Sequence, residues 1–423
     1  MHINDSQWRS LALVVALWAA FTFSAHAQSA KCVAVHGALL MPAKAKWDQL
    51  TANANAPNDR LIVALFGGEF QSQNGAVDVK LLADVGQRGP FPVLEAAVTF
   101  HANDKADLAL TLERGILVLV NTKKSGAAHV QVRASDETFE VVLSEPKAKV
   151  AIEIYGRHVA GPPNLKSARE DRPIVNVAFF ALAGEAVIST DKHATRLQAP
   201  PGPTLYIWDN LTRTPDVHRF ETLPDSLKPL TPEERQLVEK IAGFAKTWSA
   251  KNGPLVDTIR DATASKDPLE RKAAVVAAGA LDDLPGLLAV LNDQVHADAR
   301  DMAILAIRHW LGRAPGKSIE MHKHLTTTSG YTPTQAKNLI HLFNGIERDK
   351  LRQPETFDLL IQALNHAKMP ARELARWHLV RLVPDGKDIQ YDAAAPEPAR
   401  LQAIEAWRRL IPEGQLPPLP KKK

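Results

Sequence analysis

The feature that most constrains the fold is a change of hydrophobic period near the middle of the chain. From about Leu61 to Trp208, apolar and polar residues alternate in runs such as LIVALF, ILVLV, TFEVVL and IVNVAFFAL. A period of two is typical of β-strands, and turn dipeptides such as Asn74-Gly75 separate the runs. After Pro232 the apolar residues recur about every 3.6 positions, which is typical of amphipathic helices. The sequence therefore predicts an α+β chain with an N-terminal antiparallel β-sandwich and a C-terminal all-α region.

Residues 1–27 are predicted to form a signal peptide. Arg9 precedes the apolar run LALVVALWAAFTF, and Ala25 and Ala27 supply the small residues that signal peptidase accepts. We therefore expect cleavage before Gln28 and export to the periplasm or the medium. The run is short for a hydrocarbon core of about 30 Å, so an uncleaved anchor is the alternative, and membrane attachment is expected only in that case.

The charge and the cysteine content argue against nucleic-acid-binding proteins, disulfide-bonded proteins and lipoproteins. The chain has 51 basic and 47 acidic residues, a net charge of +4, and no dense basic block apart from Lys421–Lys423. Binding to nucleic acid is therefore not expected. Cys32 is the only cysteine, so no intramolecular disulfide can form. Lys31 directly before Cys32 does not fit the small residue that a lipoprotein signal requires there.

Composition divides the mature chain into segments. Proline is dense between Pro200 and Pro232, where it favours extended backbone and disfavours helix and sheet interiors. The predicted segments are an N-terminal extension at 28–60, a β-domain at 61–210, a proline-rich linker at 211–232, a helical-repeat domain at 233–415 and a disordered basic tail at 416–423.

The segment ADLALTLERGILVLV at 106–120, followed by FEVV at 139–142, resembles the periplasmic domain of FecR-type proteins. The run VAFFALAGEAVIS at 177–189, followed by RLQAPPG at 196–202, is similar to that family's second pass of strands. The resemblance implies a jelly-roll-type β-sandwich used for sensing or contact, without a catalytic centre. FecR-type regulators usually carry a cytoplasmic anti-sigma segment and a membrane span first. Here the predicted leader takes that place, so regulation of a sigma factor is not implied.

A second motif, Arg-x-x-Ala, recurs in the helical region at Arg271, Arg300, Arg372 and Arg400. Its arginines are separated by 29, 72 and 28 residues, and the long gap accommodates one degenerate unit near TPTQAKNLIHLF. The small alanine allows helices to approach closely, as in stacked helical repeats. The pattern resembles HEAT or armadillo repeats, and an irregular helical bundle is the alternative.

The tetrapeptide Gly67-Gly68-Glu69-Phe70 is one residue short of the signature of diguanylate cyclases. Alternating strands flank it, and a cyclase would require a helix-flanked fold and cytoplasmic nucleotide. We therefore interpret the two glycines as a hairpin or bulge in which φ becomes positive.

Candidate binding residues lie at the ends of two predicted strands, where Arg157 and His158 follow one strand and Trp208 ends the other. A cation beside an aromatic face suits anionic or sugar-like groups. The alternative is that the aromatic ring only covers the open end of the sandwich. His322 and His324 could supply two ligands of a metal site. The sequence does not indicate the further ligands that zinc requires, so no metal and no cofactor are predicted.

These observations predict a protein that is not an enzyme. The sequence contains no Gly-x-Ser-x-Gly elbow, no His-Glu-x-x-His helix and no phosphate-binding loop. The expected function is that of an exported scaffold or sensor that contacts protein partners in the cell envelope. The alternative is a module that binds envelope polysaccharide or another cell-wall ligand in association with an enzyme or secretion system.

Overall fold

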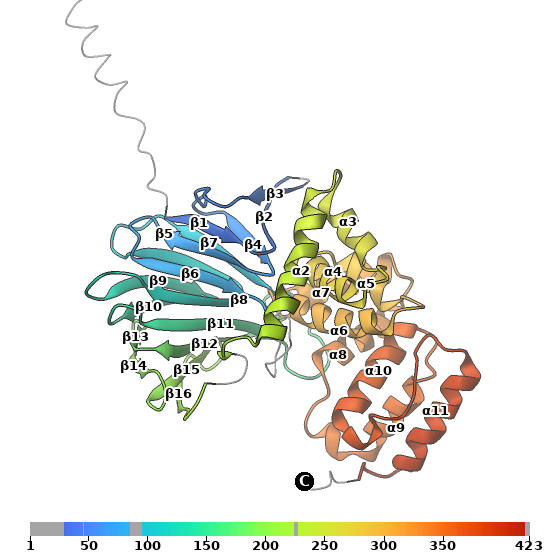
Figure 1. Ribbon diagram of the computed structural model, residues 1–423. Helices are drawn as coiled ribbons and strands as arrows, with labels where there is room; N and C mark the ends of the chain where they lie inside the picture. The colour runs from blue at the N-terminus through green and yellow to red at the C-terminus, as the bar shows by residue number, and fades with distance from the viewer. Residues whose placement is uncertain (1–28, 45, 85–94, 224–226, 419–423) are drawn as a thin grey trace, which may run out of the picture.

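The computed structural model describes residues 29–44, 46–84, 95–223 and 227–418. In these residues a largely antiparallel sheet of sixteen strands, at 30–219, precedes ten α-helices, at 232–410 (Figure 1). The predicted order of strands and helices is confirmed. The predicted leader at 1–27 and the last five residues of the predicted tail, 419–423, lie outside the described residues.

The strands form two layers that share one strand. The first layer contains, in order, β1 (Ala30–Val35), β5 (Gly68–Ser72), β6 (Val77–Leu82), β8 (Leu108–Asn121), β11 (Lys149–Arg157), β12 (Ile174–Ala183), β15 (Pro203–Asp209) and β16 (Asp216–Arg219). The second layer contains, in order, β3 (Trp47–Leu50), β2 (Ala38–Pro42), β4 (Leu61–Leu65), β7 (Ala96–His101), β8, β9 (Ala128–Ala134), β10 (Glu137–Leu143), β13 (Glu185–Ser189) and β14 (Ala194–Gln198). Only the β8–β9 pair is parallel among the pairs of these strands.

β8 passes from one layer to the other at Gly115. Residues 109–114 pair with β7 in the second layer, whereas residues 116–121 pair with β6 in the first. Gly115 has a φ of +102°, and a Cβ at this position would lie 2.3 Å from the carbonyl oxygen of Glu95. Glycine is therefore required where the strand changes layer.

The alternating residues of both layers meet in a common apolar core. Phe139 of β10 lies 4.9 Å from Phe179 of β12, measured between ring centroids, and Phe70 of β5 lies 4.9 Å from Phe100 of β7. Each of these pairs joins one layer to the other. The period of two seen in the sequence thus corresponds to one face of each strand turned toward the opposite layer.

The turn at Gly67, predicted as a hairpin or bulge, is not a hairpin. β4, which ends at Leu65, pairs with β2 and β7, whereas β5, which begins at Gly68, pairs with β1 and β6. The two strands belong to different layers and do not pair with each other. Phe66 and Gly67 have positive φ, as predicted for the glycine, because the chain reverses sharply between the layers.

Ten α-helices and two short 3₁₀ helices follow in the described part of the chain. They are α2 (Pro232–Ala250), α3 (Leu255–Ala262), α4 (Pro268–Ala280), α5 (Leu284–Leu291), α6 (Ala297–Leu311), α7 (Lys317–Thr327), α8 (Pro333–Asn344), η2 (Lys350–Arg352), α9 (Pro354–Ala363), α10 (Met369–Leu382), η3 (Pro384–Gly386) and α11 (Glu397–Leu410). Capping residues and prolines explain where several of these helices begin. Thr231 and Thr332 form capping boxes before α2 and α8, and a proline follows each of them.

The four arginines of the repeated motif occupy the same place in their helices. Each is the fourth residue of its helix, α4, α6, α10 or α11, and its Nη1 donates to a carbonyl oxygen in the segment before that helix. The pairs are Arg271 with Ser265 at 2.5 Å, Arg300 with Asp293 at 2.8 Å, Arg372 with His366 at 2.8 Å and Arg400 with Ala395 at 2.5 Å. In α8, the degenerate unit, Ala336 takes this place.

The strand and helical regions pack directly against each other. Leu40 and Val63 of the second layer belong to the same buried apolar cluster as Ala245 and Trp248 of α2. The intervening segment at 211–232 contains the edge strand β16. Among the described helices, none has the length and apolar composition needed to cross a bilayer.

Candidate functional site

The three residues predicted as a binding site do not form one surface site. Arg157 ends β11 with an exposed side chain. His158 follows it, and its Nε2 lies 3.1 Å from the carbonyl oxygen of Leu311 in α6. Trp208 is only 2% exposed, and its ring meets that of Phe139 edge-on inside the core between the layers. The structure thus brings Arg157 and His158 together and separates them from the Trp208 ring.

His158 belongs to a tight contact between β11 and the end of α6. Gly156 and Gly312 approach so closely that a Cβ on either would lie 1.9 Å from the other's carbonyl oxygen. The ring of Tyr155 lies 5.2 Å from that of His309 in an edge-on arrangement. The close packing at this contact indicates that it holds the strand region against the helical region.

A buried ionic cluster forms a second contact between the regions. Glu95, before β7, accepts from Arg114 Nε of β8 at 2.5 Å and from Arg313, which follows α6. Arg114 also donates to the carbonyl oxygen of Ala280 at 3.1 Å. Burial alone would raise the pKa of Glu95, but the two guanidinium groups outweigh it and hold the pKa below its usual value. Sequence reasoning missed this cluster because Glu95 and Arg313 are 218 positions apart.

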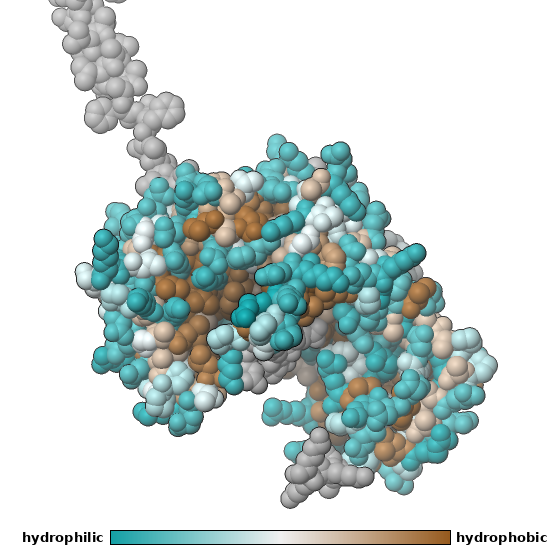
Figure 2. Space-filling view, in the orientation of Figure 1, coloured by the Kyte–Doolittle hydropathy of each residue, from teal (hydrophilic) through white to brown (hydrophobic). Residues whose placement is uncertain are grey.

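An apolar groove of about 420 Å³ lies between the outer face of the first layer and α2. Apolar side chains on its strand side include Leu82, Ile116, Val118 and Leu182, and those on its helix side include Leu230, Leu237 and Val238. Figure 2 shows apolar surface where the strands meet α2. Both regions therefore contribute to one open, largely apolar surface.

Glu153 lies on the same face of the first layer as this groove. It sits in β11 opposite Ile116 of β8 and Ala178 of β12. Burial raises the pKa of Glu153 to about 7, and the negative charge of Asp84 adds to the increase. The carboxyl group is therefore partly protonated near neutral pH.

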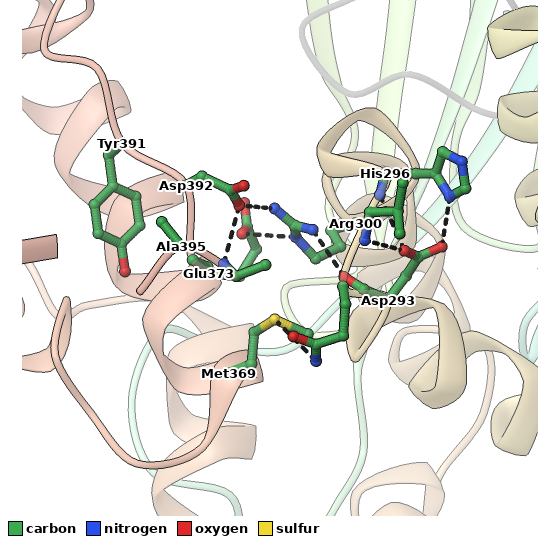
Figure 3. A network of polar contacts seen from close by, with 12 residues as sticks. Asp293, His296, Arg300, Met369, Glu373, Tyr391, Asp392 and Ala395 are labelled. Atoms are coloured by element: carbon green, nitrogen blue, oxygen red, sulfur yellow. Dashed lines mark hydrogen bonds and ion pairs between the residues drawn. The ribbon is translucent and has the colours of Figure 1, made fainter. Parts of the chain in front are cut away.

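The helices contain a network of charged side chains centred on Arg300, which is 1% exposed (Figure 3). Arg300 Nε donates to Glu373 Oε2 of α10 at 3.0 Å, and its Nη2 contacts Asp392. Glu373 Oε1 also accepts from Arg376 Nε at 2.8 Å, and Arg376 contacts Asp301 of α6. We call these five residues the arginine network. It fixes α6 against α10.

The described residues offer no evident metal centre. His322 and His324 both lie on α7, and His322 Nε2 is 3.2 Å from the carbonyl oxygen of Pro333. Nowhere in the described ranges do three or more histidine, cysteine or acidic side chains gather in a way that could hold a metal ion. Cys32 is buried, and burial raises the pKa of its thiol to about 11, which disfavours the reactive thiolate.

Comparison with known proteins identifies no relative of this chain. No family model, no curated protein and no solved structure matches it. Function must therefore be inferred from the residues and contacts of the molecule itself.

Proposed function

We propose that this protein is an exported, non-catalytic scaffold or sensor that acts through protein–protein contacts in the cell envelope. The observation that supports it most is the apolar groove between the first layer and α2. A segment of a protein partner is the proposed occupant. The two regions that line the groove share a buried core, so their relative position is set before a partner binds.

The lining of the groove favours a polypeptide over a glycan. Its floor is apolar, and its rim carries both signs of charge, from Asp84, Lys228, Glu234 and Arg235. An apolar centre with a polar rim is the usual composition of a protein interface. Among the described residues that line the groove, Phe66 is the only phenylalanine, tyrosine or tryptophan, so the groove lacks the several large aromatic faces on which sugars commonly stack.

Two finer assignments of fold are part of the proposal. We propose that the strand region is a FecR-like sandwich of jelly-roll type and that the helical region is a HEAT-like repeat. The two packed layers support the first assignment, and the arginine at the fourth position of four helices supports the second. An experimental structure superposed on members of each family would test both.

Site-specific photo-crosslinking tests the proposed function. A photoreactive residue replaces Leu82, which lines the groove and is 40% exposed, or Leu401 of α11, which is 44% exposed and serves as the matched control. We expect a protein adduct in the envelope fraction at position 82 and none at position 401. The adduct is identified, and the purified partner is then titrated against wild-type protein, Leu82→Asp and Leu401→Asp.

We expect Leu82→Asp to weaken binding of the purified partner by about tenfold or more, because a charge would enter an apolar contact. Leu401→Asp should bind as the wild type does. Equal binding by both variants would exclude the groove as the docking site. Binding of isolated envelope polysaccharide that Leu82→Asp abolishes would instead favour the glycan-binding alternative.

A further inference from the structure

A second pocket, of about 330 Å³, opens on the helical region where α4, α6 and α10 meet. Its polar lining consists of Lys272, Asp298, Asp301, Arg376 and Arg381, and the ring of Trp377 forms part of its wall. We propose that this pocket binds a small organic or inorganic oxyanion, carboxylate or phosphate, through Arg381 and Lys272. The proposal is independent of the groove beside α2, because the two sites share no residue.

The carboxylates that line this pocket are already engaged by arginines. Asp298 accepts from Arg271 Nη2 through both oxygens, each at 2.9 Å. Asp301 contacts Arg376, which also donates to Glu373. Their negative charge is therefore largely compensated within the protein, and the two carboxylates do not leave the pocket acidic.

Three cations lie in or beside this pocket. Lys272 and Arg381 line the pocket, and Arg308 of α6 lies over the ring of Trp377. Within the described residues none of the three forms an ion pair, and Arg308 donates to the carbonyl oxygen of Phe343. The pocket consequently has an excess of positive charge that an anion would compensate.

The ring of Trp377 contacts the two arginines, Arg308 and Arg381. The guanidinium carbon of Arg381 lies 3.9 Å from the Trp377 ring centroid, and that of Arg308 lies 5.0 Å from it. Stacking uses the face of a guanidinium group and leaves its N–H donors free in the plane. Arg381 can therefore present a fixed pair of donors to an oxyanion with little further loss of side-chain entropy.

The pKa values of Arg381 and His378 are consistent with several positive charges lying close together beside the pocket. Burial lowers the pKa of Arg381, and the charges of Arg308 and Arg376 lower it further, while Asp301 opposes them. Burial likewise lowers the pKa of His378 to about 4; the hydrogen bond to the Leu342 carbonyl oxygen opposes this decrease, and the charges of Arg308 and Arg381 add to it. His378 is therefore neutral at pH 7 and adds no charge of its own.

The cavity is large enough for a ligand of modest size, since small-molecule sites begin at about 300 Å³. Carboxylate and phosphate oxygens both match the spacing of guanidinium donors. Inorganic phosphate and glucuronate are therefore suitable probes, one for each chemistry.

Calorimetric titration of the full-length protein at low salt and pH 7 tests the proposal. Each probe is titrated against wild-type protein, Arg381→Gln and Lys272→Gln. Arg409→Gln and Lys337→Gln, at exposed positions of α11 and α8, are the matched controls. Circular dichroism and thermal unfolding confirm that every variant is folded.

We expect saturable 1:1 binding of at least one probe to the wild type. Arg381→Gln should weaken it by about tenfold or more, because it removes a charge-assisted hydrogen bond, and Lys272→Gln should weaken it by about threefold or more. The controls should stay within about twofold of the wild type. The proposal is overturned if neither probe saturates, if both pocket variants bind like the wild type, or if Arg409→Gln weakens binding as much as Arg381→Gln does.

Discussion

The strand and helical regions differ in where they bury charge. In the strand region the buried carboxylates among the described residues are Glu95 and Asp171, and both contact the helical region. The core between the two layers is apolar. In the helical region, by contrast, Arg300 and Glu373 are buried deep between helices, and Arg271 is nearly so.

This difference follows from how each kind of element fixes its register. In a sheet, the backbone hydrogen bonds and the alternation of side chains allow one register, because a slip of one residue exposes the apolar face. Helices that meet through small residues have no such constraint. Ala274, Ala303 and Ala375 are fully buried at these contacts, and several helix positions would pack almost equally well. Directional ionic contacts from the arginines then select one position.

The largest effect is expected from Glu373→Ala, which leaves Arg300 buried without its main partner. Loss of one member of a buried pair costs about 3–5 kcal/mol, and chemical denaturation would measure the change in unfolding free energy. Glu69→Ala, which removes a partly exposed pair with Lys80 in the strand region, should cost less than about 1 kcal/mol. The double variant Arg300→Met/Glu373→Leu should recover most of the loss. Similar losses from both glutamate variants would contradict the comparison.

Gly156→Ala, at the contact between the regions, is expected to lower the unfolding free energy by a smaller amount, about 3 kcal/mol. The added Cβ would collide with the carbonyl oxygen of Gly312, so β11 and α6 must separate. Gly243→Ala is the control, since a Cβ at Gly243 in α2 meets nothing within 4 Å and alanine favours a helix. The midpoint temperature of thermal unfolding should fall for Gly156→Ala and rise slightly for Gly243→Ala. An unchanged Gly156→Ala protein would mean that the regions are not rigidly joined there.

The smallest effect concerns Glu153, a half-buried carboxyl group on the outer face of the strand region. Its pKa rises from 4.5 to about 7 in the folded protein, so the folded state binds more protons than the unfolded state between these values. Stability therefore falls as the pH rises from 4.5 through 7. Glu153→Gln should stabilise the protein by about 2 kcal/mol at pH 8 and have little effect at pH 4. Denaturation at both pH values, with Glu140→Gln as an exposed control, checks this. A stabilisation independent of pH would refute it.

Much of the fold could be predicted because it depends on local patterns. Alternation identified the strands from Leu61 onward, and the Arg-x-x-Ala motif marked four helix starts. Alternation shows which residues share a face, but not which strand lies beside which. For that reason alternation predicts a hairpin or bulge at Gly67, where the chain in fact crosses between the layers. Strands β1 to β3, in the segment predicted as an extension, are short and lack a long alternating run.

The sites were harder to predict because they combine distant segments. Trp208 has the same strand parity as Tyr206, so both rings point into the core, and the polar ending Asp209-Asn210 concealed this. The oxyanion pocket combines Lys272 with Arg381, more than a hundred positions later. Nothing local to either residue distinguishes it from an ordinary exposed cation on a helix. Only the stacking of α4, α6 and α10 places them together.

The passage of β8 through Gly115 has a consequence for cooperativity. β8 pairs with β6 and β11 in one layer and with β7 and β9 in the other. Local opening of this strand would remove a neighbour from four others at once, on both sides of the core. Neither layer can therefore melt while the other stays intact, and the strand region behaves as one foldon rather than two.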